Sequence, residues 1–566
     1  MRRLSGIFFI FLLSQSALPQ VAPDKYFVEF TDKNNSPYSI DRPWEFLSQR
    51  ALDRRAIASI SIEINDLPVN PNYVEAVRLI GVDVITRSKW FNGITIYTPN
   101  PSLIDQIEQL PFVLNVLKNG PKSLPTQPFD DKFAMEKPWL NPGSSGTPVS
   151  LKVADSAEYG LSFTQVHMVK TDLLHNLGFR GYGKVIAVLD AGFQNANSLS
   201  PFDSLWQNNQ ILGTRDFVTP GGNVFVGHPH GMEVLSIMGG YVPGQLIGMA
   251  PKASFWLLRS EDTGSEYLIE EYNWVSAAEF ADSAGADIIN SSLGYTVFDD
   301  STQNHTCADM NGNTTPVTRG ANIAFSKGIL VVNSAGNGGG NLNFPCVSAP
   351  ADGTDVLAIA AVDSLGQYAS FSSTGQVNGA YVKPNVAAMG KLTVLAIPDG
   401  SISRSNGTSF SSPIVAGSAA CLWQAYPQYS NATLKMAIEG SGSQYTSPDK
   451  YLGYGIPDFF KAFERLLRVN SLKAPGSVSV YPNPFAGDDP LRMNIRLVTG
   501  QLLRLELVDI TGRKILEKDN IPCAAGENTV SLSGLSGLKP GLYILKIQSQ
   551  NGTDLHETIK IQRVKR

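Results

Sequence analysis

The sequence is short of cysteine, of charge and of long apolar runs, and each shortage excludes a class of protein. Four cysteines among 566 residues cannot form the disulfide framework of a small secreted scaffold. Charged residues make up only 17% of the chain, and the net charge is -5. Without a basic excess to follow a phosphate backbone, nucleic acid is not an expected partner. No apolar run reaches the roughly 20 residues of a membrane-spanning helix, so we expect no membrane span in the mature protein.

The N-terminal residues have the features of a secretory signal peptide. Arg2 and Arg3 precede the apolar run Ile7–Leu13, and small residues around Ser16 follow at the spacing of a cleavage site. We therefore predict export, with residues 1–18 as the signal peptide.

Cysteines can pair in the oxidising compartment that export implies. Cys307 and Cys346 lie in loop sequence rich in Gly and Asn and are the better candidates for a disulfide. Cys421 sits in an apolar helical run and is typical of a small buried apolar residue.

The first folded segment has the order β, α, β, β, α, β, which is typical of a ferredoxin-like α+β domain, and we assign it to residues 19–120. The expected strands are Lys25–Thr31, Val82–Thr86, Gly93–Tyr97 and Val113–Leu117, and the expected helices are Asn72–Ile80 and Pro101–Leu110. Residues 121–154 are rich in Pro, Ser, Gly and Lys and indicate an exposed, cleavable linker.

Two further domains follow the linker. In residues 155–470, short β-branched runs (Val185–Leu189, Ile288–Asn290, Ile329–Asn333) alternate with helical stretches (Ile269–Ala284, Pro413–Ala425). That alternation predicts an α/β fold with a parallel sheet. Residues 476–566 have short strands separated by turn residues, which predicts a small β-sandwich.

Two motifs of the α/β domain offer an acid and a base. Asp190 ends a buried strand before Gly192, at the position where open α/β sheets bind ligands. His230, in Gly227-His-Pro-His-Gly231, stands at the start of a helical stretch, where it can act as a general base near neutral pH. Taken singly, these residues also fit a turn-forming Asp and a structural or metal-binding His.

Two more motifs offer a nucleophile and an amide donor. Ser409, in Asn406-Gly-Thr-Ser-Phe-Ser-Ser-Pro413, falls just before an apolar helix, so its hydroxyl lies in the field of helix N–H groups. Asn337 lies in a glycine-rich loop after a strand and could offer its amide to an oxyanion. A helix N-cap and a turn are the ordinary alternatives.

Together, and in the order Asp190, His230, Ser409, these motifs resemble the subtilisin-like serine peptidases, the subtilases. The resemblance covers about 300 residues and includes Gly248-Met-Ala-Pro251, Ile289-Asn-Ser-Ser-Leu-Gly294, Phe371-Ser-Ser-Thr-Gly375 and Lys383-Pro-Asn-Val386. One departure is Met232, since the family has Thr after the glycine that follows the histidine.

The resemblance implies a role for each residue. Ser409 would be the nucleophile, His230 the general base and acid, and Asp190 the group that orients His230. Asn337 and the Ser409 N–H would hold the oxyanion. The segment Ser292, Leu293 and Gly294 would pair with an extended substrate backbone.

The flanking domains carry resemblances of their own. The N-terminal module resembles the inhibitory prodomain of subtilases, which blocks the cleft and is cut off. The C-terminal domain, with Val480-Tyr-Pro-Asn-Pro-Phe485 and Leu538-Lys-Pro-Gly-Leu-Tyr543, resembles the sorting domain of the type IX secretion system of Bacteroidetes. This second resemblance implies that type IX secretion machinery is a partner and that the protein reaches the medium or the cell surface through the periplasm.

No metal site is predicted, and the chemistry requires no cofactor. By family habit a structural calcium ion is the expected one, but the loop Asp309–Asn313 lacks the EF-hand glutamate. The acidic set Glu261, Asp262, Glu266, Glu270 and Glu271 is typical of a solvated helix face.

The sequence thus predicts a secreted serine endopeptidase, made as a latent precursor and acting on polypeptides as a monomer. The alternative is a catalytically inactive surface adhesin that retains the subtilase scaffold.

Overall fold

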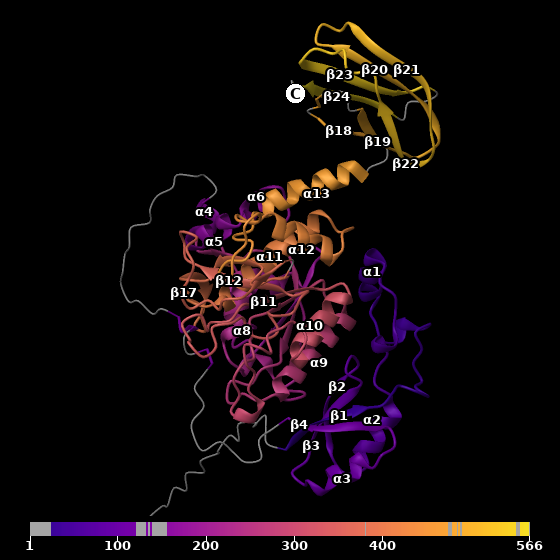
Figure 1. Cartoon of the computed structure of the whole chain (residues 1–566). Helices are drawn as coiled ribbons and strands as arrows, with labels where there is room; N and C mark the ends of the chain where they lie inside the picture. Colours follow the sequence, from indigo (N-terminus) through magenta and orange to yellow (C-terminus); the bar gives the residue numbers. More distant parts are fainter. Residues whose placement is uncertain are drawn as a thin grey trace, which may run out of the picture. The chain divides into compact units, whose positions relative to one another are not determined.

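The computed structural model describes residues 24–119, 132–133, 136–138, 156–379, 381–473, 478–483, 485–486, 490–550 and 555–564. The chain divides into two compact units, Met1–Ala462 and Phe463–Arg566, and each is described by itself (Figure 1). The expected signal peptide, 1–18, lies outside the described residues, as does most of the expected linker, 121–154. Among the described helices, none combines the length and apolar character required to span a lipid bilayer.

The first unit begins with a four-stranded antiparallel sheet of order β2-β3-β1-β4. Its elements are β1 (Lys25–Phe30), α2 (Pro71–Arg78), β2 (Asp83–Ser88), β3 (Gly93–Tyr97), α3 (Ser102–Glu108) and β4 (Val113–Lys118). Val28, Ile94 and Ile96 of the strands pack with Val77 and Ile107 of the helices in one apolar core. The predicted β-α-β-β-α-β order is therefore confirmed.

One helix of this segment, α1 (Gln49–Ala58), was not predicted. Ser48 caps its N-terminus by accepting a hydrogen bond from the Ala51 N–H. The buried side of α1 includes the charged residues Arg54 and Arg55, so the helix has no apolar stripe that a sequence pattern could reveal.

The centre of the first unit is a seven-stranded sheet of order β15-β12-β11-β10-β5-β9-β6, in which every pair is parallel. The strands are β5 (Val185–Asp190), β6 (Ile211–Asp216), β9 (Ser254–Arg259), β10 (Ile288–Ser291), β11 (Leu330–Ser334), β12 (Leu357–Val362) and β15 (Val386–Met389). The predicted parallel α/β fold is confirmed. Because the strands are parallel, the carboxyl ends of β5, β10 and β11 lie at one edge of the sheet.

Helices α8 (His230–Gly239), α9 (Ile269–Ala284), α10 (Pro316–Ser326) and α11 (Thr408–Ala425) pack with the sheet. The range predicted for α9 is correct, whereas α11 begins five residues earlier than predicted, so that Ser409 lies within its first turn. Pro413 is therefore inside the helix and offers no N–H to the Ser409 carbonyl. That carbonyl instead accepts a hydrogen bond from Ser292 Oγ at 2.8 Å.

Further helices and short strands complete this unit. They are α4 (Ser156–Tyr159), α5 (Phe163–Met168), α6 (Thr171–Asn176), α7 (Asp203–Gln207), β7 (Tyr241–Val242), β8 (Leu246–Ile247), β13 (Val377–Asn378), β14 (Tyr381–Val382), β16 (Thr393–Ala396), β17 (Ile402–Ser405) and α12 (Asn431–Gly440), and α13 (Phe459–Lys473) leads out of the unit.

The second unit contains two antiparallel sheets, β18-β19-β22 and β21-β20-β23-β24. Its strands are β18 (Val478–Tyr481), β19 (Leu491–Leu497), β20 (Gln501–Asp509), β21 (Lys514–Cys523), β22 (Gly526–Leu532), β23 (Gly541–Ser549) and β24 (His556–Arg563). Alternate residues of both sheets, among them Met493, Leu505 and Leu545, form one buried core. The predicted β-sandwich is confirmed.

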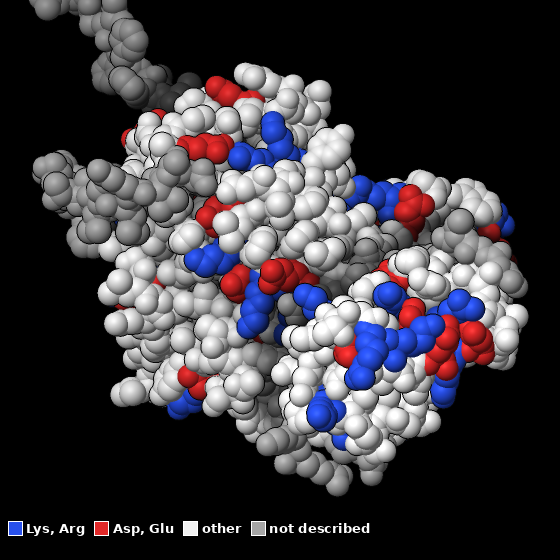
Figure 2. All heavy atoms as spheres, turned by 90° about the horizontal axis from the view of Figure 1, so that it is seen from above, with Lys and Arg blue, Asp and Glu red and all other residues white. Residues whose placement is uncertain are grey.

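The surface is sparingly charged, as the composition implies. On the face shown in Figure 2 most of the surface is uncharged, and Lys and Arg lie among Asp and Glu.

Candidate active site

Asp190 and His230 form a buried, hydrogen-bonded pair in the site. Asp190 is the last residue of β5 and His230 the first of α8, and the His230 Nδ1–Asp190 Oδ1 distance is 2.6 Å. A Cβ added to Gly231 would lie 2.8 Å from Asp190 Cβ and 2.4 Å from the Gly192 carbonyl oxygen. A glycine after His230 therefore lets the start of α8 approach the strand end. Met232, which departs from the family pattern, is fully buried.

Ser409 lies on the first turn of α11, and its side chain faces the same site. Its hydroxyl donates to Glu136 Oε1 at 2.8 Å, and the other oxygen of that carboxylate, Oε2, is 2.8 Å from His230 Nε2. The hydrogen bonds of the structure thus link Ser409 to His230 through Glu136.

Asn337 follows β11 and turns its amide nitrogen toward the same carboxylate. Its Oδ1 accepts hydrogen bonds from the N–H and the hydroxyl of Thr408, at 2.9 and 3.0 Å. These two bonds direct Nδ2 into the site, where it donates to Glu136 Oε1.

The segment predicted to pair with substrate, Ser292, Leu293 and Gly294, comes directly after β10. It lines one cavity of about 210 Å³ together with Ser409 and Asn337. The Leu293 carbonyl accepts a hydrogen bond from Asn333 Nδ2 at 3.0 Å, which joins the segment to β11. The seven residues that the subtilase resemblance assigns to the active site therefore lie together at the predicted edge of the parallel sheet.

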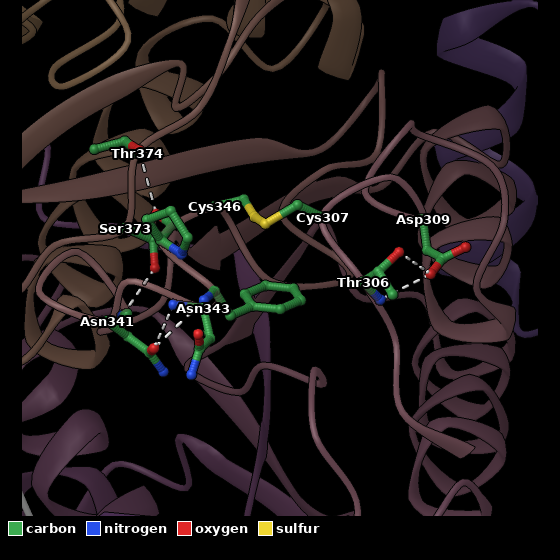
Figure 3. The surroundings of a disulfide bond; sticks show 11 residues. Thr306, Cys307, Asp309, Asn341, Asn343, Cys346, Ser373 and Thr374 are labelled. Atoms are coloured by element: carbon green, nitrogen blue, oxygen red, sulfur yellow. Dashed lines mark hydrogen bonds between the residues drawn. A yellow bond between two sulfur atoms is a disulfide. The ribbon is translucent and has the colours of Figure 1, made fainter. Parts of the chain in front are cut away.

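The predicted disulfide between Cys307 and Cys346 is present and supports a wall of this cavity (Figure 3). Cys346 lines the cavity, and the bond ties it to the loop that carries Asp309. Asp309 caps its own loop by accepting from the N–H and hydroxyl of Thr306, both at 2.7 Å. Cys421 is buried and unpaired, as predicted.

Glu136 was not predicted as part of the site. It lies in the segment expected to be an exposed linker, and that expectation is wrong for Glu136 and Phe133, which are 4% and 6% exposed. The Phe133 ring stacks on the His230 imidazole with ring centroids 4.0 Å apart. A single glutamate in a stretch rich in Pro, Ser and Lys carries no signal in the sequence that could have indicated this position.

The charges around His230 favour the protonated form of its imidazole. Burial alone would lower the pKa of His230, but the carboxylates of Asp190 and Glu136, through their charges and hydrogen bonds, raise it well above its ordinary value. An imidazolium donates from both nitrogens, which matches a ring held between two carboxylates.

The expectation of a solvated acidic helix face is also wrong. The four glutamates of this set are all buried, namely Glu261, Glu266, Glu270 and Glu271. One carboxylate oxygen from each of the first three lies within 4.8 Å of the other two.

Comparisons with known proteins match each part of the chain. The family model described as "Subtilase family" matches residues 181–455, "Peptidase S8 propeptide domain, Bacteroidota" matches 25–132, and "Secretion system C-terminal sorting domain" matches 479–562. Subtilisin E of Bacillus subtilis is 30% identical over 312 residues, which are 54% of this chain and 71% of that protein. Subtilisin of Bacillus pumilus is 30% identical over 307 residues, 54% of this chain and 97% of that protein. A crystal structure of MycP1 from the ESX-1 type VII secretion system aligns with 54% of this chain and 89% of that one, at 21% identity and a TM-score of 0.42.

Proposed function

The chain belongs to the subtilase family of serine-type endopeptidases, and from this premise we propose that Ser409, His230 and Asp190 are its catalytic residues and that Glu136 holds the precursor inactive. The observation that carries the proposal is the convergence of Ser409 Oγ, His230 Nε2 and Asn337 Nδ2 on the single carboxylate of Glu136.

In the active enzyme, Ser409 Oγ would attack the carbonyl carbon of the scissile peptide bond while its proton passes to His230 Nε2. Asp190, hydrogen-bonded to Nδ1, would orient the ring and stabilise the imidazolium. The oxyanion would be held by Asn337 Nδ2 and the Ser409 N–H. His230 would then protonate the leaving amine, and a water molecule activated by the same imidazole would hydrolyse the acyl-enzyme.

Substrate would bind as an extended strand along Ser292, Leu293 and Gly294. This segment follows β10 at the edge of the cavity, and Ser292 holds the carbonyl of the nucleophile. The backbone of an added strand supplies affinity without regard to sequence.

The precursor would be inactive because the Glu136 side chain occupies the place where a substrate carbonyl group would bind. Its carboxylate takes the hydrogen bonds of the nucleophile, the base and the amide donor at once. The Glu136 N–H donates to the Phe133 carbonyl at 2.8 Å, and it is the Glu136 side chain that the Ser409 hydroxyl contacts. In this arrangement the site is filled by a side-chain carboxylate, which Ser409 cannot cleave.

The N-terminal domain is held against the catalytic domain by buried charges. Asp282 of α9 accepts from Arg54 at 2.6 Å and from Lys89 at 2.7 Å, and it also pairs with Arg55. Glu279 of the same helix accepts from the Ser88 hydroxyl at 2.6 Å. These contacts support a prodomain that keeps Glu136 in place until it is removed.

The C-terminal sorting domain indicates export by the type IX system to the cell surface or the medium. The proposed enzyme therefore works outside the cell on polypeptides, after removal of the signal peptide, the prodomain and the sorting domain, and we propose that it does so as a monomer.

A fluorophosphonate probe tests the proposal. Matured protein is expected to label covalently, and Ser409→Ala is expected to abolish both labelling and peptide hydrolysis while leaving the fold intact by circular dichroism. A folded, matured protein that does not label would overturn the proposal and favour the adhesin alternative.

A further inference from the structure

Three glutamates between β9 and the first turn of α9 form a buried pocket beside the cleft. Glu261, Glu266 and Glu270 are 0%, 5% and 0% exposed, and we call them the glutamate pocket. Three carboxylates so close together, with almost no contact with water, are strongly stabilised by a positive charge among them.

The positive charge in the precursor is the ammonium group of Lys132. Its Nζ donates to Glu261 Oε1 and, at 2.7 Å, to Glu266 Oε2, and it lies 5.2 Å from the centre of the Tyr295 ring. Burial would lower the pKa of Lys132, but the three carboxylates raise it well above its ordinary value.

The pocket also has fixed walls and one unused acceptor. Tyr295 donates its hydroxyl to Glu261 Oε2 at 2.8 Å, and the Asp262 N–H donates to Glu270 Oε1 at 2.9 Å. Glu270 Oε2 is buried and has no hydrogen-bond partner within the described part of the chain. A guanidinium, with more donors than an ammonium, could reach this oxygen as well.

Lys132 connects the glutamate pocket to the substrate cleft. Lys132 lines the same cavity as Ser409, and Tyr295 follows Gly294 of the substrate-pairing segment directly. Lys132 also precedes Glu136 by four positions. A substrate running in the same direction would therefore bring a residue on the N-terminal side of its scissile bond to the pocket.

We propose that the glutamate pocket is a substrate subsite that binds a lysine or arginine side chain N-terminal to the scissile bond, and that Lys132 fills it in the precursor. This rests on the proposed function. Once Lys132 leaves with the prodomain, the carboxylates lose their counter-ion. A basic substrate residue would restore the charge balance that the precursor shows.

The test compares peptides that share one scissile bond and carry a single Lys, Arg or norleucine at successive positions before it. Full-length protein is matured, and active sites are counted with the fluorophosphonate. At one position, kcat/KM is expected to be about 10- to 100-fold higher for Lys or Arg than for norleucine, the scale of a buried charge pair.

Two variants attribute that preference to the pocket. Glu266→Gln is expected to remove most of the preference, measured as the ratio of kcat/KM for the Lys peptide to that for the norleucine peptide, because Gln keeps the shape but not the charge. Glu271→Gln is the matched control: Glu271 is a buried glutamate of α9 next to Glu270, but it faces His305 and the Val317 N–H, and the preference should survive.

Several outcomes would overturn the subsite. One is labelled, active enzyme with equal rates for basic and neutral peptides at every position. Another is a basic preference that Glu266→Gln leaves intact. A third is Ca²⁺ titration calorimetry showing Glu266-dependent binding in an enzyme without basic preference, which would make the pocket a metal site.

A binding measurement separates this inference from the proposed function. Ser409→Ala protein, its prodomain removed by an added protease, is titrated against fluorescent Lys and norleucine peptides. Tighter binding of the Lys peptide, lost in Ser409→Ala/Glu266→Gln, supports the subsite even if the wild type fails to label. Equal binding of the two peptides would overturn it.

Discussion

Replacing Glu136 by alanine should convert the uncut precursor into a species that reacts with a fluorophosphonate. In the wild-type precursor the carboxylate holds Ser409 Oγ and His230 Nε2, both at 2.8 Å, and also binds Asn337 Nδ2. Removing it frees the nucleophile and lets the imidazole lose the proton that two carboxylates stabilise.

The size of the effect can be worked from these contacts. The Glu136 side chain and the His230 ring are almost fully buried, so they form an ion pair with little screening. Truncating one member of a buried, hydrogen-bonded charge pair costs about 2–5 kcal/mol, or roughly 30-fold to several thousand-fold in an equilibrium. We expect the labelling rate to rise by about 10² to 10³, since the Phe133 ring still covers His230.

The assay follows labelling on a gel that separates the uncut chain from its cleavage products, so that only the intact precursor is counted. Glu136→Gln should lie between wild type and Glu136→Ala, because the amide keeps hydrogen bonds but not the charge. Lys137→Ala is the control, since Lys137 is exposed and next in the chain.

The reasoning fails if intact Glu136→Ala precursor labels no faster than wild type while the matured enzyme labels readily. Latency would then come from the bulk of the prodomain alone. A similar gain in Lys137→Ala would also refute it, because the effect would reflect a loosened segment.

Three further predictions follow from other contacts. Because the pKa of His230 is raised, its ion pair with Glu136 is complete below the ordinary value near 6.5 and is lost as the pH rises through the raised value. Labelling of the wild-type precursor should therefore increase in alkaline buffer, and this increase should be absent in Glu136→Ala. Asp282→Asn should destabilise the precursor by about 3–5 kcal/mol in denaturant unfolding and the matured enzyme far less, since Arg54, Arg55 and Lys89 leave with the prodomain; equal losses would contradict it. Loss of the Cys307–Cys346 bond, which spans 39 positions, should lower unfolding free energy by about 4 kcal/mol, and an unchanged melting curve of the Ser/Ser variant would contradict this.

Much of the site could be predicted because its residues stand at boundaries that local sequence reveals. Asp190 ends an apolar strand and His230 begins an apolar helix, so hydrophobic periodicity places both at the edge of the sheet. The sequence pattern predicts a start of α11 at Pro413, because proline is favoured in the first turn of a helix, whereas the helix begins at Thr408 and continues through the proline.

Glu136 and the glutamate pocket could not be predicted, because only long-range contacts give them their character. Glu136 binds His230 across 94 positions and Ser409 across 273. In the sequence, Glu266 is an ordinary acidic residue near a helix start. Its buried environment depends on Lys132, which lies 134 positions away in the chain. A charged group can be buried only when it has a partner of opposite charge or hydrogen-bonding groups, and that long-range partner cannot be identified from a single sequence.

The proline inside α11 has a mechanical consequence. Because Pro413 leaves the Ser409 carbonyl without its helical donor, a hydroxyl from the neighbouring strand end takes that place. The peptide unit of Ser409, the proposed nucleophile, is thereby hydrogen-bonded to Ser292, beside Leu293 and Gly294, so the hydroxyl proposed to react and the segment proposed to bind substrate are fixed relative to each other. A substrate bound along that segment would be aligned on Ser409 by the same contact.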